Sequence, residues 1–291
     1  MRNYNYFMEF IITTAKNDDR IRAVVMNGSR VDPGALVDRL SDFDIIFFVH
    51  NIQSFTSDHN WIERIFGPIL IMQKPDDWFN HPYDYSGIEP FTYLMHFVNG
   101  IRLDLTLVDL ENIPASYRGN DLEAGVILVK KDDMESFEWH FNIDKFIVKK
   151  PSSKQFTDTV NEFFWLATYV AKGIRRDQFL FVKNIREYFQ AEMLLTMLGW
   201  SAGIDYDFKF STGNLNKYLQ KYLPQQEWQK LVKCLSSSSL TTAFQDERDM
   251  MALFNAHAIK VAHFWGFPYE SDLIDQISKY LDEVEEMDLS V

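Results

Sequence analysis

The chain has 291 residues, of which 46% are hydrophobic and 24% are charged. This length and composition exclude a small disulfide-stapled scaffold, a collagen-like chain and a largely disordered chain. The 29 basic and 42 acidic residues give a net charge of −13, which argues against non-specific binding to a nucleic-acid backbone. We therefore expect a folded protein that does not bind nucleic acid.

Part of this acidity is concentrated near the end of the sequence. Residues 270–291 hold eight acidic side chains and one basic residue, Lys279. We interpret this segment as the solvated face of a last helix, in preference to a partner-binding acidic tail.

Cysteine usage and hydropathy indicate the compartment. The single cysteine, Cys234, cannot form an internal disulfide, and it excludes a thiolate metal cluster. Glu9 interrupts the first apolar stretch, which therefore does not predict a signal peptide. The uncharged segment 193–204 is too short to cross a bilayer. We expect a cytoplasmic protein without a membrane partner, and we make no prediction of its oligomeric state.

The first half of the chain predicts a helix followed by strands. Residues 5–16 carry apolar side chains at helical spacing. Residues 21–26 and 43–49 are compact apolar runs that predict central strands. Residues 91–98 and 101–108 are two further strand candidates.

The last two of these strands are joined by a turn signal. Asn99 and Gly100 both tolerate positive φ, so this pair predicts a hairpin. In the strand that follows, Arg102, Asp104 and Thr106 are expected on one face. The opposite face is expected to carry the apolar side chains of Ile101, Leu103, Leu105 and Leu107.

After Pro151 the hydrophobic pattern of the sequence changes from strand-like to helical. Long helical patterns cover residues 155–172, 176–200, 225–235, 240–265 and 271–286. The predicted fold class is α+β. A mixed β-sheet flanked by helices is expected over residues 1–150, and an α-helical bundle domain over 151–291.

The candidate catalytic residues lie at the ends of the first two predicted strands. Gly28 and Ser29 follow the first strand, where a glycine without a Cβ lets backbone N–H groups approach phosphate oxygens. Asp42 and Asp44 enter the second strand with i, i+2 spacing, so their carboxylates project from one face, as a shared divalent metal site needs. Each feature alone is common in turns and caps, but the combination favours function.

Asp104 completes the set if its strand lies beside the strand of Asp42 and Asp44. Three carboxylates and one Gly-Ser turn then form a two-metal site for phosphoryl or nucleotidyl transfer. No serine-hydrolase elbow, Walker-type loop or dinucleotide fingerprint is present. His257 and His263 are not spaced as a zinc pair.

These motifs resemble the DNA polymerase β-type nucleotidyltransferase superfamily, and within it the aminoglycoside 6-adenylyltransferases, also called streptomycin adenylyltransferases. The resemblance covers residues from about 18 to 214. It is carried by the segments DDRIRAVVMNGSRVDP, DFDIIFFV, ILIMQKPDDW, FTYLMHFVNGIRLDLTLVDLE, VKKPS, NEFFWLATYVAKGI and GIDYDFKFSTG.

The resemblance implies transfer of AMP from Mg-ATP to a hydroxyl of streptomycin, expected to be the 6-hydroxyl, with release of pyrophosphate and inactivation of the antibiotic. Asp42 and Asp44 would then bind Mg²⁺. Ser29 and the backbone of Gly28 would hold the β- and γ-phosphates. For Arg30, a further phosphate contact and a surface ion pair are equally supported.

The resemblance leaves the general base open. Asp104 is either a third metal ligand or the base that takes the proton of the attacking hydroxyl. Glu162 is the alternative base, and a solvent-facing helical glutamate is an equally supported interpretation of it.

The second half is expected to contact drug and ATP. Lys172 is a candidate contact to the triphosphate, although a surface lysine is the favoured interpretation. Trp165 is a candidate for substrate binding, but Phe163, Phe164 and Trp165 at helical spacing are expected to pack into the core. In the first half, residues 76–78 are weaker candidates for the drug site.

Two other functions stay open at this point. The same chemistry could act on another small aminocyclitol or on a protein hydroxyl. A non-catalytic relative that binds nucleotide or drug is the alternative from another class, and the presence of Asp42, Asp44 and Asp104 counts against it.

Overall fold

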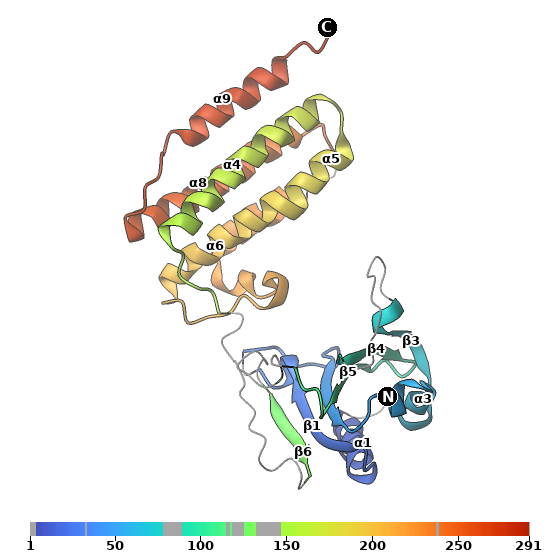
Figure 1. The fold of residues 1–291 in the computed structure, drawn as a ribbon. Coiled ribbons are helices and arrows are strands. Elements are labelled where there is room, and N and C mark those ends of the chain that lie inside the picture. The colour runs from blue at the N-terminus through green and yellow to red at the C-terminus, as the bar shows by residue number, and fades with distance from the viewer. Residues whose placement is uncertain are drawn as a thin grey trace. The chain divides into compact units, whose positions relative to one another are not determined.

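The computed structural model describes residues 4–32, 34–77, 89–114, 117, 125–131, 147–236 and 239–290, except for the side chains of residues 4, 5 and 76. The chain divides into two compact units, Met1–Lys145 and Phe146–Val291 (Figure 1). The sequence predicts a division at residues 150 and 151. No helix among the described residues is both long enough and apolar enough to span a bilayer.

The first unit contains a six-stranded mixed sheet. Its strands are β1 (Ile21–Asn27), β2 (Phe43–Val49), β3 (Ile69–Gln73), β4 (Phe91–Phe97), β5 (Arg102–Asp109) and β6 (Val126–Lys130). They lie in the order β3-β4-β5-β2-β1-β6, in which β2 and β5 are parallel and every other neighbouring pair is antiparallel. The four predicted strands are confirmed, whereas the edge strands β3 and β6 were not predicted.

Helices and an apolar core cover one face of this sheet. The helices are α1 (Tyr4–Asn17), α2 (Gln53–Thr56) and α3 (Trp61–Phe66). Phe7 of α1 and Phe66 of α3 are fully buried against inward side chains of the strands, such as Phe47 and Tyr93. Full burial of one such side chain stabilises the fold by about 1.5–3 kcal/mol, so this core fixes which face of each strand points inward.

The opposite face of the sheet is apolar at one end and polar at the other. Its small core is made of Ala23, Val25, Ile46, Phe48 and Val108. Asp44 follows the same alternation as Ile46 and Phe48, since side chains two residues apart share a face. The polar end of this face therefore carries the predicted site.

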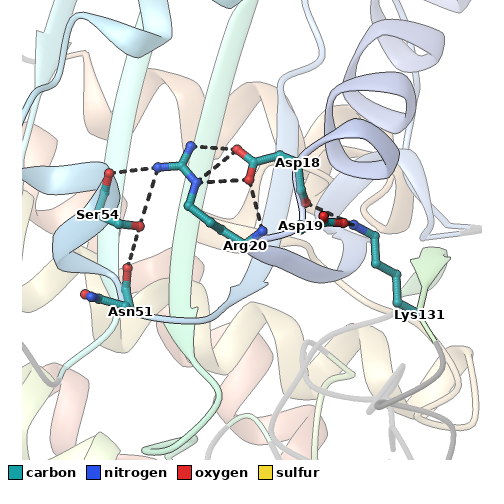
Figure 2. A network of polar contacts seen from close by, with 6 residues as sticks. All are labelled: Asp18, Asp19, Arg20, Asn51, Ser54 and Lys131. Carbon is teal, nitrogen blue, oxygen red and sulfur yellow. Dashed lines mark hydrogen bonds and ion pairs between the residues drawn. The ribbon is translucent and has the colours of Figure 1, made fainter.

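A polar network joins the strand ends that lie far from that site (Figure 2). The guanidinium of Arg20 donates to Oδ2 of Asp18 at 2.6 Å and to the carbonyl of Ser54 at 2.9 Å. Lys131, just after β6, donates to the carbonyl of Asp18 at 2.9 Å. These bonds join the end of α1 to the start of α2 and to the edge strand, which fixes β1 between its neighbours.

The second unit is helical. Its helices are α4 (Ser153–Arg175), α5 (Phe179–Asn184), the π-helix η5 (Ile185–Gln190), α6 (Ala191–Asp205), α7 (Gln225–Leu235), α8 (Ala243–Trp265) and α9 (Leu273–Glu286). Helix α4 begins with a capping box between Ser152 and Gln155. The helix predicted over 176–200 is present as one continuous helical segment made of α5, η5 and α6. It begins at Phe179, after left-handed Asp177 with φ 55°, and its middle part is π-helical.

The acidic residues near the end of the chain lie on a helix that packs by its apolar side. Leu281 and Val284 of α9 are buried. Arg248 of α8 donates to Asp282 and to Glu285, each at 2.6 Å, and the other acidic groups of α9 face solvent. The interpretation as a solvated last helix is confirmed.

A buried ion pair links η5 to α8. Nε of Arg186 donates to Oε2 of Glu247 at 3.0 Å, and the Arg186 guanidinium also donates to the carbonyls of Cys234 and Asp246 at 3.2 Å. Gln190 donates to the second oxygen of Glu247. Burial raises the pKa of the Glu247 carboxyl, although the charge of Arg186 opposes that shift.

We predict that Arg186→Met lowers the free energy of unfolding by about 3–5 kcal/mol, because it leaves the Glu247 carboxylate buried without its counterion. Arg248→Met is the matched control: its acidic partners are largely exposed, so a loss of about 1 kcal/mol or less is expected. Urea unfolding of both variants measures the difference. Equal losses would show that the Arg186–Glu247 pair adds nothing beyond a surface pair.

Candidate active site

The three predicted carboxylates come together on the polar end of the sheet. In the parallel pairing of β2 with β5, Asp44 lies opposite Asp104. Leu103, Leu105 and Leu107 are fully buried on the helix-covered side, so the predicted polar face of β5 is confirmed. Asp42 precedes β2 and reaches the same place, since one guanidinium contacts both Asp42 and Asp104.

That guanidinium belongs to Arg102. It lies 3.1 Å from Oδ2 of Asp42 and 2.8 Å from Oδ2 of Asp104, and its Nε donates to Oδ1 of Asp104 at 3.0 Å. Burial raises the pKa of the Asp42 carboxyl, the charge of Arg102 opposes this, and the carboxylate of Asp104 adds to it. Sequence analysis predicts Arg102 on the polar face of this strand but assigns it no role. Its i, i+2 spacing from Asp104 was the sequence feature that could have indicated their contact.

Gly28 packs directly against the Asp44 carboxylate. It begins the 3-10 turn η1 (Gly28–Arg30), which follows β1 and includes Ser29. Its φ is +74°, and a Cβ at this position would lie 2.0 Å from Oδ2 of Asp44. Both the backbone conformation and the space therefore require glycine, which exposes the backbone of the turn beside the carboxylate.

Arg30 is directed to the loop before β2. Its Nε donates to the carbonyl of Asp42 at 2.7 Å, its Nη2 donates to the carbonyl of Ser41, and its guanidinium lies 4.1 Å from the ring centroid of Phe43. These contacts tie the Gly-Ser turn to the residue that presents the first carboxylate. Arg30 therefore positions Asp42 in this structure, and its contact with phosphate stays a prediction.

A hollow of about 390 Å³ adjoins the carboxylates on the same face. Arg102 forms part of its wall and Asp77 another part, and the full lining is Ile71, Met72, Gln73, Asp77, Leu94, His96 and Arg102. Lys74 pairs with Asp77 at 2.7 Å. Of the other two weaker candidates, Trp78 lies outside the described residues, as does the side chain of Asp76.

The remaining predicted residues lie on α4 of the helical unit. Glu162 is exposed and Trp165 is 55% exposed, so the expected packing of Trp165 into the core is wrong. Phe163 and Phe164 are buried as predicted. Lys172 lies half-buried, with its Nζ 4.6 Å from the Tyr169 ring.

Spacing places these side chains in a single stripe. Trp165 and Tyr169 contact each other edge-on, with centroids 5.7 Å apart. Positions 162, 165, 169 and 172 recur at intervals of three and four residues, which on a helix align along one face. We name Glu162, Trp165, Tyr169 and Lys172 the α4 stripe.

A second polar cluster lies inside the helical unit. Nδ1 of His257 lies 2.8 Å from Oγ of Ser201, and its Nε2 lies 3.5 Å from Oε2 of Glu227. Ser201 is 1% exposed, so its hydroxyl is not accessible as a nucleophile. This cluster connects α6, α7 and α8, and we assign it to the structure of the bundle.

The cluster predicts a pH-dependent stability. Burial lowers the pKa of His257, with Glu227 opposing the shift, so the folded state takes up a proton less readily than the unfolded chain. The free energy of unfolding is therefore expected to be highest above pH 6.5, the ordinary histidine value, and to fall as the pH drops below it. Urea unfolding between pH 5 and 8 checks this. His257→Gln should flatten the profile, and the same change at exposed His263 should not.

We predict that Gly28→Ala abolishes the nucleotidyl transfer that the sequence predicts, because its Cβ displaces the Asp44 carboxylate. Gly100→Ala is the matched control, with φ +84° and nothing within 4 Å of its Cβ. Both variants are expected to lose about 1–2 kcal/mol of unfolding free energy from the left-handed backbone. Urea unfolding and a transfer assay separate the two effects, and a fully active Gly28→Ala would contradict the close approach to Asp44.

Three relatives match the chain over nearly its full length. The aminoglycoside 6-adenylyltransferase of Campylobacter jejuni is 34% identical and the match covers 97% of this chain and 95% of the relative. The proteins of the same name from Bacillus subtilis (strain 168) and Staphylococcus aureus are each 30% identical, covering 98% and 98%, and 92% and 94%, respectively.

Among solved structures, the crystal structure of an aminoglycoside 6-adenyltransferase from Bacillus subtilis matches with 28% identity and a TM-score of 0.48, covering 99% of this chain and 100% of that one. The profile of the streptomycin adenylyltransferase family matches residues 1–284. The chain therefore belongs to the streptomycin adenylyltransferase family, a family of nucleotidyltransferases.

Proposed function

We propose that the chain acts in the cytoplasm and transfers AMP from Mg-ATP to the 6-hydroxyl of streptomycin, releasing pyrophosphate and inactivating the drug. The observation that carries this proposal is the grouping of Asp42, Asp44 and Asp104 beside the Gly28 turn. The names of the three relatives support an aminoglycoside acceptor.

The donor set fits a divalent cation in its chemistry. Asp42, Asp44 and Asp104 offer carboxylate oxygens, the ligands that Mg²⁺ prefers, and the place between Asp42 and Asp104 already holds a positive group, the guanidinium of Arg102. No three acidic, histidine or cysteine side chains of the described residues form a ready metal cluster, so the carboxylates must adjust to share an ion. When bound, Mg²⁺ neutralises charge that develops on the phosphate oxygens.

The Gly28 turn is suited to phosphate. Because Gly28 lacks a Cβ, the turn packs directly against the Asp44 carboxylate, and we assign its backbone N–H groups and the hydroxyl of Ser29 to the β- and γ-phosphates beside the carboxylates. Arg30 holds this turn to the carbonyls of Ser41 and Asp42. We assign Arg30 a positioning role, with phosphate contact as a second role.

Asp104 is the candidate base that belongs to the carboxylate group. It lies opposite Asp44 in the sheet, so it serves either as a metal ligand or as the group that accepts the proton of the attacking hydroxyl. Glu162 is an exposed residue of the α4 stripe and remains the alternative base. Glu162→Gln retaining full activity would leave Asp104 as the only one of these two carboxylates able to act as base.

Acceptor binding is assigned to two surfaces. The hollow beside Arg102 includes Asp77, whose carboxylate suits a cationic drug. On the α4 stripe, exposed Trp165 offers an aromatic face and Glu162 a negative charge. Lys172, at the other end of the stripe, is assigned to the triphosphate.

The first test is pyrophosphate release from Mg-ATP by the full chain, with and without streptomycin and with a panel of other aminoglycosides. We expect release that depends on streptomycin and falls at least about a hundredfold in Asp44→Asn, because metal binding supplies several kcal/mol and each 1.36 kcal/mol is a factor of ten. Asp58→Asn, which alters an exposed pair with Arg64, is the matched control and should stay active.

Each outcome assigns a different function. Release with another aminoglycoside but not with streptomycin would identify that aminoglycoside as the acceptor. Nucleotide binding without release for any drug would favour a protein hydroxyl or a non-catalytic role. Full activity in Asp44→Asn would show that these carboxylates do not form the metal site.

A further inference from the structure

Arg102 lies at the centre of the carboxylate group. Its guanidinium contacts Asp42 at 3.1 Å and Asp104 at 2.8 Å, and its pKa is raised, mainly by the hydrogen bond to Asp104. Asp44 adds to the negative field around it. The guanidinium thus neutralises a place where three carboxylates gather.

A positive charge stabilises such a place. Carboxylates held close together repel one another, and partial burial strengthens that repulsion. The side chains of Asp104, Asp42 and Arg102 are 18%, 32% and 38% exposed, so water screens them only in part. A divalent cation bound by Asp42 and Asp104 would need the position that the guanidinium holds.

We propose that Arg102 is an exchangeable internal counterion, which pairs Asp42 with Asp104 when no metal is bound and withdraws when a divalent cation takes its place. This inference rests on the proposed function, because it takes these carboxylates as the metal ligands. It explains why the described residues contain a fitting donor set and yet no ready metal cluster. It also makes Arg102 a positioning residue that sets metal affinity.

The structure gives Arg102 room to withdraw. The hollow of about 390 Å³ adjoins it, and the arginine side chain is already part of the hollow's wall. His96 lies opposite Arg102 in the pairing of β4 with β5, and Asp77 lines the same hollow, so a displaced guanidinium finds polar groups there. An arginine has a long flexible stem, so the exchange needs no movement of the strand.

The test is Mn²⁺ binding to the full chain without nucleotide, measured by calorimetry. We expect Arg102→Met to bind Mn²⁺ about five- to tenfold more tightly than the parent chain, because the ion no longer competes with the guanidinium. Arg102→Lys, which keeps the charge, should stay close to the parent. Arg64→Met removes a guanidinium from the exposed pair with Asp58 and should change nothing.

Two further measurements locate and validate the effect. The rise in melting temperature on adding Mn²⁺ should be larger in Arg102→Met than in the parent, because the metal then restores a lost counterion. Asp42→Asn combined with Arg102→Met should lose the tight binding, because Asp42 is one of the two carboxylates that the guanidinium and the ion share. A purely structural role for Arg102 predicts the opposite direction, with weaker binding when the arginine is removed.

Unchanged or weaker Mn²⁺ binding by a folded Arg102→Met, or tight binding that survives Asp42→Asn, would overturn the exchange. Pyrophosphate release by the parent chain reports on the proposed function separately. Release that depends on streptomycin together with unchanged Mn²⁺ affinity in Arg102→Met rejects the counterion alone. Absence of release in the parent rejects the proposed function.

Discussion

The parallel pairing of β2 with β5 is the constraint on which the site depends. It sets Asp44 opposite Asp104, and its register is held by leucines of β5 that are fully buried on the other face. A slip of one residue would turn these leucines toward solvent and the carboxylates into the core, since side chains alternate with a period of two. At about 1.5–3 kcal/mol for each buried leucine, the apolar core itself fixes where the carboxylates lie.

The core places the carboxylates, and neighbouring residues supply the space and the positive charge that they require. Gly28 has no side chain and so leaves room for Asp44, Arg30 donates to backbone carbonyls before β2, and Arg102 supplies the positive charge. Only Arg102 competes with a cation for the same oxygens. Shape and charge at the site are thus supplied by separate elements, the turn after β1 and the start of β5.

The burial of a strand explains what the sequence could predict. Compact apolar runs located β1 and β2, which are buried on both faces, β-type runs joined by Asn99 and Gly100 located β4 and β5, and alternation along β5 gave the polar face that carries Asp104. The edge strands β3 and β6 are mostly exposed or half-buried, so their patterns are weak. The contact between Arg102 and Asp42 crosses from one strand to the loop before another, which no local pattern encodes. The helical patterns do predict a break between residues 172 and 176, and left-handed Asp177 lies in the break that the structure shows between α4 and α5.

The acidic residues near the end of the chain act locally. Arg248 pairs with two of them, and burial of Leu281 and Val284 holds α9 in place. The remaining acidic residues therefore occupy the side of the last helix that faces solvent. Exposed charges are screened over about 8 Å at physiological ionic strength, and the net charge of −13 is therefore a poor guide to what a cationic acceptor meets. The charge that matters for recognition is the local one. At the carboxylate group it depends on whether Arg102 or a metal ion holds the position between Asp42 and Asp104, so a cationic acceptor would meet a different local charge in the two states.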